Sequence, residues 1–167
     1  PSHRVTDPVL RAELLRHHPE AAEFVEHQRI APITYPYEWS VSMLADAGVL
    51  TLDLQLRLLK HRLSLKDATA YNVQFRQGKP VFIDLTSIER PERLDIWKAL
   101  GQFNQMFTFP LLLNRERGWD LRSFFLGSLG GRTLEDVAKS FGTLARWRPS
   151  LLLDLTLPDI DLNKEVG

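Results

Sequence analysis

The residues with the clearest chemical potential lie in one stretch, residues 64–89, which reads SLKDATAYNVQFRQGKPVFIDLTSIE. Two β-prone runs, NVQF and PVFID, flank a turn at Gly78 and predict a hairpin. Asn72 and Asp84 are each six residues from Gly78, so a turn centred there places both side chains at the open end of one sheet face. An amide oxygen beside a carboxylate is a hard oxygen site of the kind that Mg²⁺ prefers. We therefore predict Asn72 and Asp84 as metal ligands, with Asp67 close to the same site.

Three nearby residues have weaker assignments. Lys66 and Thr69 could contact a phosphate or a substrate, although both are also ordinary solvated loop residues. Tyr71 is expected to pack between a helix and the hairpin. Asp and Asn commonly hydrogen-bond to their own backbone in loops. A purely structural role for Asp67, Asn72 and Asp84 therefore stays open.

The element that should position this site is a long helix over residues 40–62. One apolar stripe contains Met43, Ala47, Leu50, Leu54 and Leu58, and a second contains Val49, Leu52, Leu56, Leu59 and Leu63. Two stripes give an apolar surface wide enough to be buried on more than one side. We therefore expect this helix to be the central helix of the domain.

Local signals predict further elements on both sides of the long helix. They indicate a helix from Asp7 to Arg16, a second from Pro19 through Val25, an extended segment held by Tyr35, Tyr37 and Trp39, a helix over 92–113 that Pro110 kinks or ends, a short helix in LRSFFLG, and a helix that begins at Thr133. The expected fold is mainly α with one short β-hairpin at residues 72–84, an α+β class.

Composition sets wider limits. The 167 residues fit a single domain 1–167, divided into a helical and extended segment 1–38, a core 39–148 and a tail 149–167. Because 21 Lys and Arg balance 21 Asp and Glu, the overall charge favours neither nucleic acid nor an anionic membrane. The chain has no cysteine, no signal pattern and no membrane-spanning run, so we expect a cytoplasmic protein. It begins at Pro1 without an initiator Met, which suggests a piece of a longer protein.

The spacing Asp-x-x-x-x-Asn, followed by a hairpin that ends in Ile-Asp, resembles the catalytic loop of protein kinases and aminoglycoside phosphotransferases. The resemblance covers about residues 40–113, including the preceding helix. It implies that Asp67 is the acceptor-side catalytic base and that Asn72 and Asp84 hold Mg²⁺ on ATP. It also implies a kinase-like C-terminal lobe without its nucleotide lobe.

The chain departs from the kinase pattern at several positions. Leu65 stands where a histidine is expected, and Leu85 and Thr86 replace the Phe-Gly that follows the metal-binding aspartate. No glycine-rich phosphate loop or phosphate-gripping lysine precedes the motif. Because positioning and electrostatics supply nearly all the catalysis in phosphoryl transfer, a site without that grip is expected to be degenerate.

Longer blocks resemble a bacterial family of nodulation-related proteins and SAM-dependent methyltransferases. These blocks are YPYEWS, LKDATAYNVQF, PVFIDLTSIE and QFNQMFTFPLLL, within residues 33–113. The resemblance places this chain outside the methyltransferase domain. No strand followed by a glycine-rich turn suggests SAM binding here, since GSLGG at 127–131 follows no clear strand. SAM would bind only to a methyltransferase domain that this chain lacks.

These resemblances imply an accessory domain of such a protein, which binds a small-molecule substrate or a partner, including a methyltransferase domain of the same parent protein. One alternative is a Mg-ATP-dependent small-molecule phosphotransferase whose N-lobe is missing from this chain. The other is a purely structural interaction domain.

Overall fold

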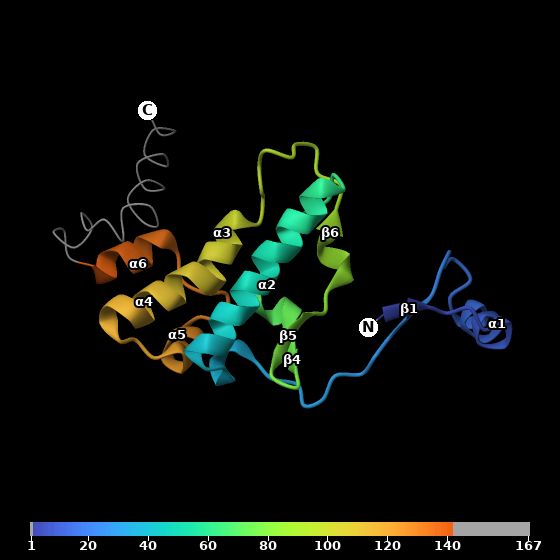
Figure 1. Cartoon of the computed structure of the whole chain (residues 1–167), viewed down its shortest axis with the longest axis horizontal. Coiled ribbons are helices and arrows are strands. Elements are labelled where there is room, and N and C mark those ends of the chain that lie inside the picture. The colour runs from blue at the N-terminus through green and yellow to red at the C-terminus, as the bar shows by residue number, and fades with distance from the viewer. Residues whose placement is uncertain (1, 142–167) are drawn as a thin grey trace. The chain divides into compact units, whose positions relative to one another are not determined.

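A computed structural model describes residues 2–141, and the expected tail 149–167 lies outside this range. The chain forms two compact units, Pro1–Pro32 and Ile33–Gly167. The described elements confirm a mainly α fold with short antiparallel strand pairs (Figure 1). None of the helices described between residues 2 and 141 has the length and apolar content that crossing a membrane requires.

The N-terminal unit contains one helix and one pair of short strands. Its elements are β1 (Ser2–Arg4), α1 (Pro8–His17) and β2 (Val25–His27), with β1 and β2 antiparallel. As predicted, Asp7 begins α1: its carboxylate accepts from the backbone N–H groups of Val9 and Leu10 at 2.8 and 3.2 Å.

The predicted second helix, from Pro19 through Val25, is wrong. Val25 instead lies opposite Arg4 in the strand pair. The Glu23 carboxylate binds the guanidinium groups of Arg4 and Arg11, and these charge-assisted bonds lower its pKa to about 2. The strand pairing and these ion pairs hold the segment in a nonhelical conformation that its local sequence does not predict.

The second unit is built around the longest of its described helices (Figure 1). The helices described in it are α2 (Val41–Lys60), α3 (Leu100–Phe103), α4 (Phe109–Arg117), α5 (Leu121–Gly127) and α6 (Leu134–Ser140). Its strands are β3 (Ser64–Leu65), β4 (Val73–Arg76), β5 (Lys79–Phe82) and β6 (Ile88–Glu89), paired β3 with β6 and β4 with β5. Short turns of 3-10 helix are η1 (Pro36–Glu38), η2 (Ala70–Asn72) and η3 (Leu85–Ser87), and η4 (Asn104–Thr108) is a π-helix.

Helix α2 forms where the sequence predicts it. The Ser40 hydroxyl caps its start by accepting from the Met43 N–H at 3.2 Å. The first stripe faces the core, where Ala47 and Leu58 are buried. The second stripe does not behave as expected, because Val49, Leu52 and Leu56 are exposed. The prediction that both stripes are buried is therefore wrong for the described part of the chain.

The helix predicted over 92–113 begins later and continues further. Residues 90–98 are irregular, and α3 begins only at Leu100. Pro110 neither ends nor begins the helical run: it lies in the first turn of α4, directly after the π-helix η4. A proline lacks the N–H that continues the ladder, and the wider π turn accommodates the ring without breaking the helix.

The segment before α2 is held partly as predicted. Trp39 is buried against Phe75, with ring centroids 5.1 Å apart, and its indole donates to the Thr34 hydroxyl at 2.9 Å. The Gln74 side chain binds both backbone groups of Thr34, at 3.0 and 2.9 Å. Tyr35 is exposed and its ring stacks on that of Tyr37, so its predicted role as a core anchor is wrong.

Candidate functional site

The candidate site is formed by two loops that the β3–β6 pair holds together. The first loop follows β3, and the second leads from β5 into β6 through η3. Leu65 pairs with Ile88, and the Lys66 N–H donates to the Ser87 carbonyl at 2.8 Å. This pairing places the segment that contains Asp67 beside the segment that contains Asp84.

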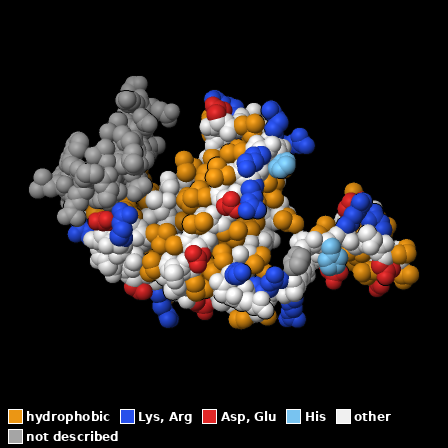
Figure 2. All heavy atoms as spheres, viewed as in Figure 1, with side chains coloured by type: hydrophobic (Ala, Val, Ile, Leu, Met, Phe, Trp, Pro, Cys, Tyr) orange, Lys and Arg blue, Asp and Glu red, His pale blue; other side chains and the backbone are white. Residues whose placement is uncertain are grey.

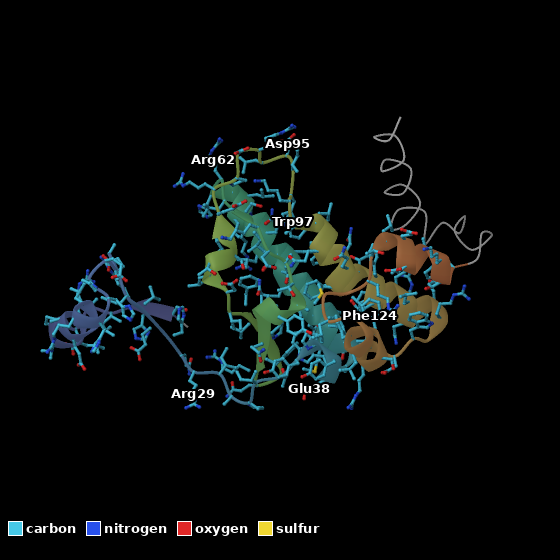
Figure 3. The ribbon with its side chains drawn as sticks, turned by 180° about the vertical axis from the view of Figure 1, so that it is seen from behind. Arg29, Glu38, Arg62, Asp95, Trp97 and Phe124 are labelled. Atoms are coloured by element: carbon cyan, nitrogen blue, oxygen red, sulfur yellow. The ribbon has the colours of Figure 1, made fainter. Side chains whose placement is uncertain are left out.

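Helix α2 fixes the start of the first loop through a buried glutamine. The side-chain oxygen of Gln55 accepts from the Leu65 N–H at 2.8 Å, and its side-chain amide nitrogen donates to the Ser64 hydroxyl at 3.0 Å. Two residues from the α3 side complete the support. The indole of Trp97, labelled in Figure 3, donates to the Leu65 carbonyl at 2.9 Å. The side-chain oxygen of Gln102 accepts from the Ala68 N–H at 2.6 Å. Hydrogen bonds from the protein itself therefore hold the backbone of this loop in place.

Sequence reasoning missed these supports. The one available signal for Gln55 was a lone uncharged polar residue in the apolar run LDLQLRLL. A buried amide requires hydrogen-bond partners, which a sequence cannot locate when they lie beyond the end of the helix.

Asn72 and Asp84 are linked through a third residue, Ser87. The Asn72 amide donates to the Ser87 hydroxyl at 3.0 Å, and that hydroxyl donates to the Asp84 carboxylate at 2.5 Å. The other Asp84 oxygen accepts from the backbone N–H and the hydroxyl of Thr86, at 2.9 and 2.6 Å. The Ser87 hydroxyl, and then that of Thr86, stabilise the carboxylate and lower the pKa of Asp84.

The predicted cross-strand pairing of Asn72 with Asp84 is wrong by one residue. Arg76 pairs with Lys79, so Gln77 and Gly78 form a two-residue turn, and both have positive φ, 52° and 74°. Such a turn matches the twist of the two strands. Its centre lies between Gln77 and Gly78, so Asn72 lies opposite Ile83, whose N–H donates to the Asn72 carbonyl at 2.8 Å.

Of the remaining predicted site residues, Asp67 and Thr69 form hydrogen bonds within the first loop. The Asp67 carboxylate accepts from the Thr69 N–H at 3.1 Å, and the Thr69 hydroxyl accepts from the Tyr71 N–H at 3.4 Å. The Lys66 side chain is exposed. Burial raises the pKa of Tyr71, whose phenol has no hydrogen-bond partner within the described residues. The catalytic role of Asp67 and the phosphate contacts of Lys66 and Thr69 stay predictions.

The hydrogen bonds that Asp84 already accepts limit how readily this site could hold a metal ion. An ionised carboxylate has about four lone-pair sites, and three donors already occupy the carboxylate of Asp84. A Mg²⁺ ion would therefore compete with the Thr86 and Ser87 hydroxyls for Asp84. Within residues 2–141, no group of three or more His, Cys, Asp and Glu side chains is placed to hold a metal ion.

Replacing Ser87 with alanine is expected to lower the free energy of unfolding by about 1–3 kcal/mol, because it leaves the Asn72 amide without this acceptor and Asp84 without this donor. Urea unfolding followed by circular dichroism measures the change. Ser42→Ala is the control: it removes an exposed serine hydroxyl that contacts the Ser40 hydroxyl at 2.9 Å, and we expect it to change stability by less than about 1 kcal/mol. Equal effects of the two variants would contradict a structural role for Ser87.

The described residues thus define a mainly α domain with short antiparallel strand pairs and a hydrogen-bonded loop site at the end of its longest helix. In sequence, the chain is similar to the nodulation protein NoeA of Rhizobium meliloti (strain 1021), with 38% identity over 137 residues. The match covers 82% of this chain but only 29% of that protein. No protein-family model matches the chain, and no solved structure matches it significantly. The expected resemblance to nodulation-related proteins is confirmed, whereas the methyltransferase and kinase-like resemblances stay predictions.

Proposed function

We propose that this chain is an accessory domain of a larger nodulation-related, cytoplasmic protein, in which a degenerate phosphotransferase-like site holds the fold and presents a surface for a substrate or partner. The similarity to a nodulation protein supports the nodulation-related role. The match covers only 29% of that protein, which supports an accessory role for this chain within a larger protein. The partner proposed first is a methyltransferase domain of the same parent protein, which would bind SAM itself.

The observation that carries the proposal is the bridge from Asn72 through Ser87 to Asp84. In the phosphotransferase pattern, a Mg²⁺ ion joins the asparagine to the aspartate. In this chain a serine hydroxyl joins them directly, and Thr86 satisfies the other carboxylate oxygen. The two loops are therefore tied together by side chains, without requiring an ion between them.

The alternative is a Mg-ATP-dependent phosphotransferase whose nucleotide lobe lies outside this chain. One observation favours it: Asp67 lies on a fixed loop and is partly exposed, as an acceptor-side base must be. In that case Mg²⁺ would displace the Thr86 and Ser87 hydroxyls from Asp84, and Lys66 and Thr69 would lie near the phosphates. A purely structural interaction domain would use the same bridge and bind neither ligand.

Titration calorimetry with ATP and excess Mg²⁺, on this chain and on the longest natural form of the protein, tests the proposal. We expect no heat of binding from either form at ATP concentrations up to about 1 mM, a level that includes ordinary substrate affinities. Asp84→Asn is the diagnostic variant because it retains the size of the side chain and removes its charge, and circular dichroism verifies that the variant is folded. Micromolar ATP affinity that Asp84→Asn abolishes and Ser42→Ala preserves would establish the phosphotransferase instead.

A further inference from the structure

The exposed apolar stripe of α2 has no partner within the described residues. Val49 and Leu56 are 67% and 62% exposed, and Leu52 is 40% exposed. Together with Ala45 and Leu59 they form what we call the outer stripe, with the alternating spacing of four and three residues that is typical of helix pairs. Figure 2 shows hydrophobic side chains gathered over α2. Such a continuous row indicates an interaction surface.

A groove of about 610 Å³ lies along part of this stripe. Its α2 wall extends only from Val41 to Leu52, and its other wall is formed by residues of α3, η4 and α4: Phe103, Phe107, Thr108, Leu111, Leu112, Asn114 and Arg115. Leu56 lies one turn beyond the groove and is among the most exposed apolar residues of the helix. The first half of α2 therefore borders the apolar groove, and its second half presents the exposed side chain of Leu56.

Charged residues follow one edge of the outer stripe. At 100° per residue, Asp46, Asp53, Arg57 and Lys60 all lie on the same side of Val49. Asp53 and Arg57 form an ion pair within the helix at 2.8 Å. Asp46 and Lys60 are exposed near opposite ends of the helix. The edge is thus acidic toward the start of α2, basic toward its end and neutral in sum.

We propose that the outer stripe is the interface of a symmetric dimer, in which α2 of a second copy packs antiparallel to α2 around a two-fold axis between Leu52 and Asp53. This register places Val49 opposite Leu56 and brings Ala45 to within one residue of the position opposite Leu59. Leu56 of each copy then enters the groove of the other, and Asp46 of each copy faces Lys60 of the other. Asp53 of each copy lies near the axis, where it is paired with Arg57 of its own helix at 2.8 Å. A two-fold interface requires a self-complementary surface, and the apolar shape together with the outer charges Asp46 and Lys60 satisfies that requirement.

Charge favours a second copy over other occupants. A nucleic acid or an anionic membrane would favour an excess of basic residues, whereas this edge contains two acidic and two basic residues. In an antiparallel dimer the acidic end of one α2 faces the basic end of the other, so Asp46 and Lys60 attract each other across the interface. In a parallel dimer like charges would face each other and repel. The proposal does not depend on the proposed accessory function, because it uses only α2 and the groove beside it.

Sedimentation velocity of the full chain, from about 1 to 500 µM at low salt, tests for the dimer over a range typical of moderate association. Asp46→Lys alone places lysines against Lys60, and Lys60→Asp alone places aspartates against Asp46. Each variant alone is expected to weaken dimerisation about 10-fold at low ionic strength, and less at high salt. An equimolar mixture of the two is expected to recover the wild-type affinity to within about 3-fold, because the mixed dimer contains two attractive pairs.

Leu56→Asp tests the apolar contact, and we expect it to weaken dimerisation roughly 100-fold because it places a carboxylate in the partner's groove. Leu129→Asp, at another exposed leucine, is the matched control and should leave the affinity unchanged. Circular dichroism verifies that each variant is folded. A chain that stays monomeric at 500 µM would overturn the proposal. A monomer is also the result expected if another segment of the protein occupies the groove. A mixture no tighter than the single variants would also overturn it.

Discussion

Replacing Phe107 with alanine is expected to lower the free energy of unfolding by about 3–5 kcal/mol, which is among the largest losses we expect from truncating a described side chain of the second unit. Phe107 is 1% exposed and lies in the π-helix η4. Its ring packs against the ring of Phe103, with centroids 5.0 Å apart. It also lies directly over Gly48, where an added Cβ atom would be 3.3 Å from the Phe107 ring. Truncation therefore leaves a cavity between α2 and the α3–α4 run.

Chemical denaturation of the full chain, with the midpoint and slope fitted together, measures this loss. Leu126→Ala is a suitable control because Leu126 is exposed on α5, and its truncation should cost less than about 0.5 kcal/mol. A loss below about 1 kcal/mol for Phe107→Ala would contradict the packing described for the core. Phe107 also lines the groove beside the outer stripe, so the same variant should weaken the proposed dimer.

The helices that the sequence predicts well are those with a local cap. Asp7, Ser40 and Thr133 each accept a hydrogen bond from a backbone N–H two or three residues later, and each begins a helix as expected. A cap and the apolar spacing behind it lie within a few residues of one another. Such signals can be interpreted without knowing the rest of the fold.

The predictions that fail depend on contacts distant in sequence. Val25 belongs to a strand because Arg4 lies opposite it, 21 positions earlier in the chain. The second stripe of α2 has an apolar composition whether or not another element covers it. Its composition predicts burial, but the described residues of this chain do not provide a covering element.

The candidate site shows the same limit at smaller scale. The spacing of Asp67, Asn72 and Asp84 places them on adjoining loops, and the structure does link Asn72 to Asp84. The link goes through Ser87 because the turn centre lies half a residue from Gly78, and a one-residue change of register exchanges the two faces of a strand. The loop sequence therefore predicts which residues approach one another, but not which atoms bond.

Adding a methyl group at Gly131 is expected to destabilise the second unit by about 3 kcal/mol or more, since overpacking against a rigid backbone and a positive φ both oppose it. Gly131 lies between α5 and α6 with φ +82°, and a Cβ atom there would lie 2.4 Å from the carbonyl oxygen of Gln105. Gln105 belongs to η4, so the obstacle is helix backbone and cannot rotate away.

The neighbouring glycine supplies the control for this prediction. A Cβ atom at Gly130 would meet nothing within 4 Å, so Gly130→Ala should change stability by less than about 1 kcal/mol, and it can raise stability by reducing the freedom of the unfolded chain. Thermal and urea unfolding of Gly131→Ala and Gly130→Ala, compared side by side, separate a steric effect from a general effect of removing glycine. If the two variants unfold alike, the close approach of this turn to η4 is refuted. A selective loss at Gly131 would instead establish that the α5–α6 connection packs directly on the π-helix that also carries Phe107.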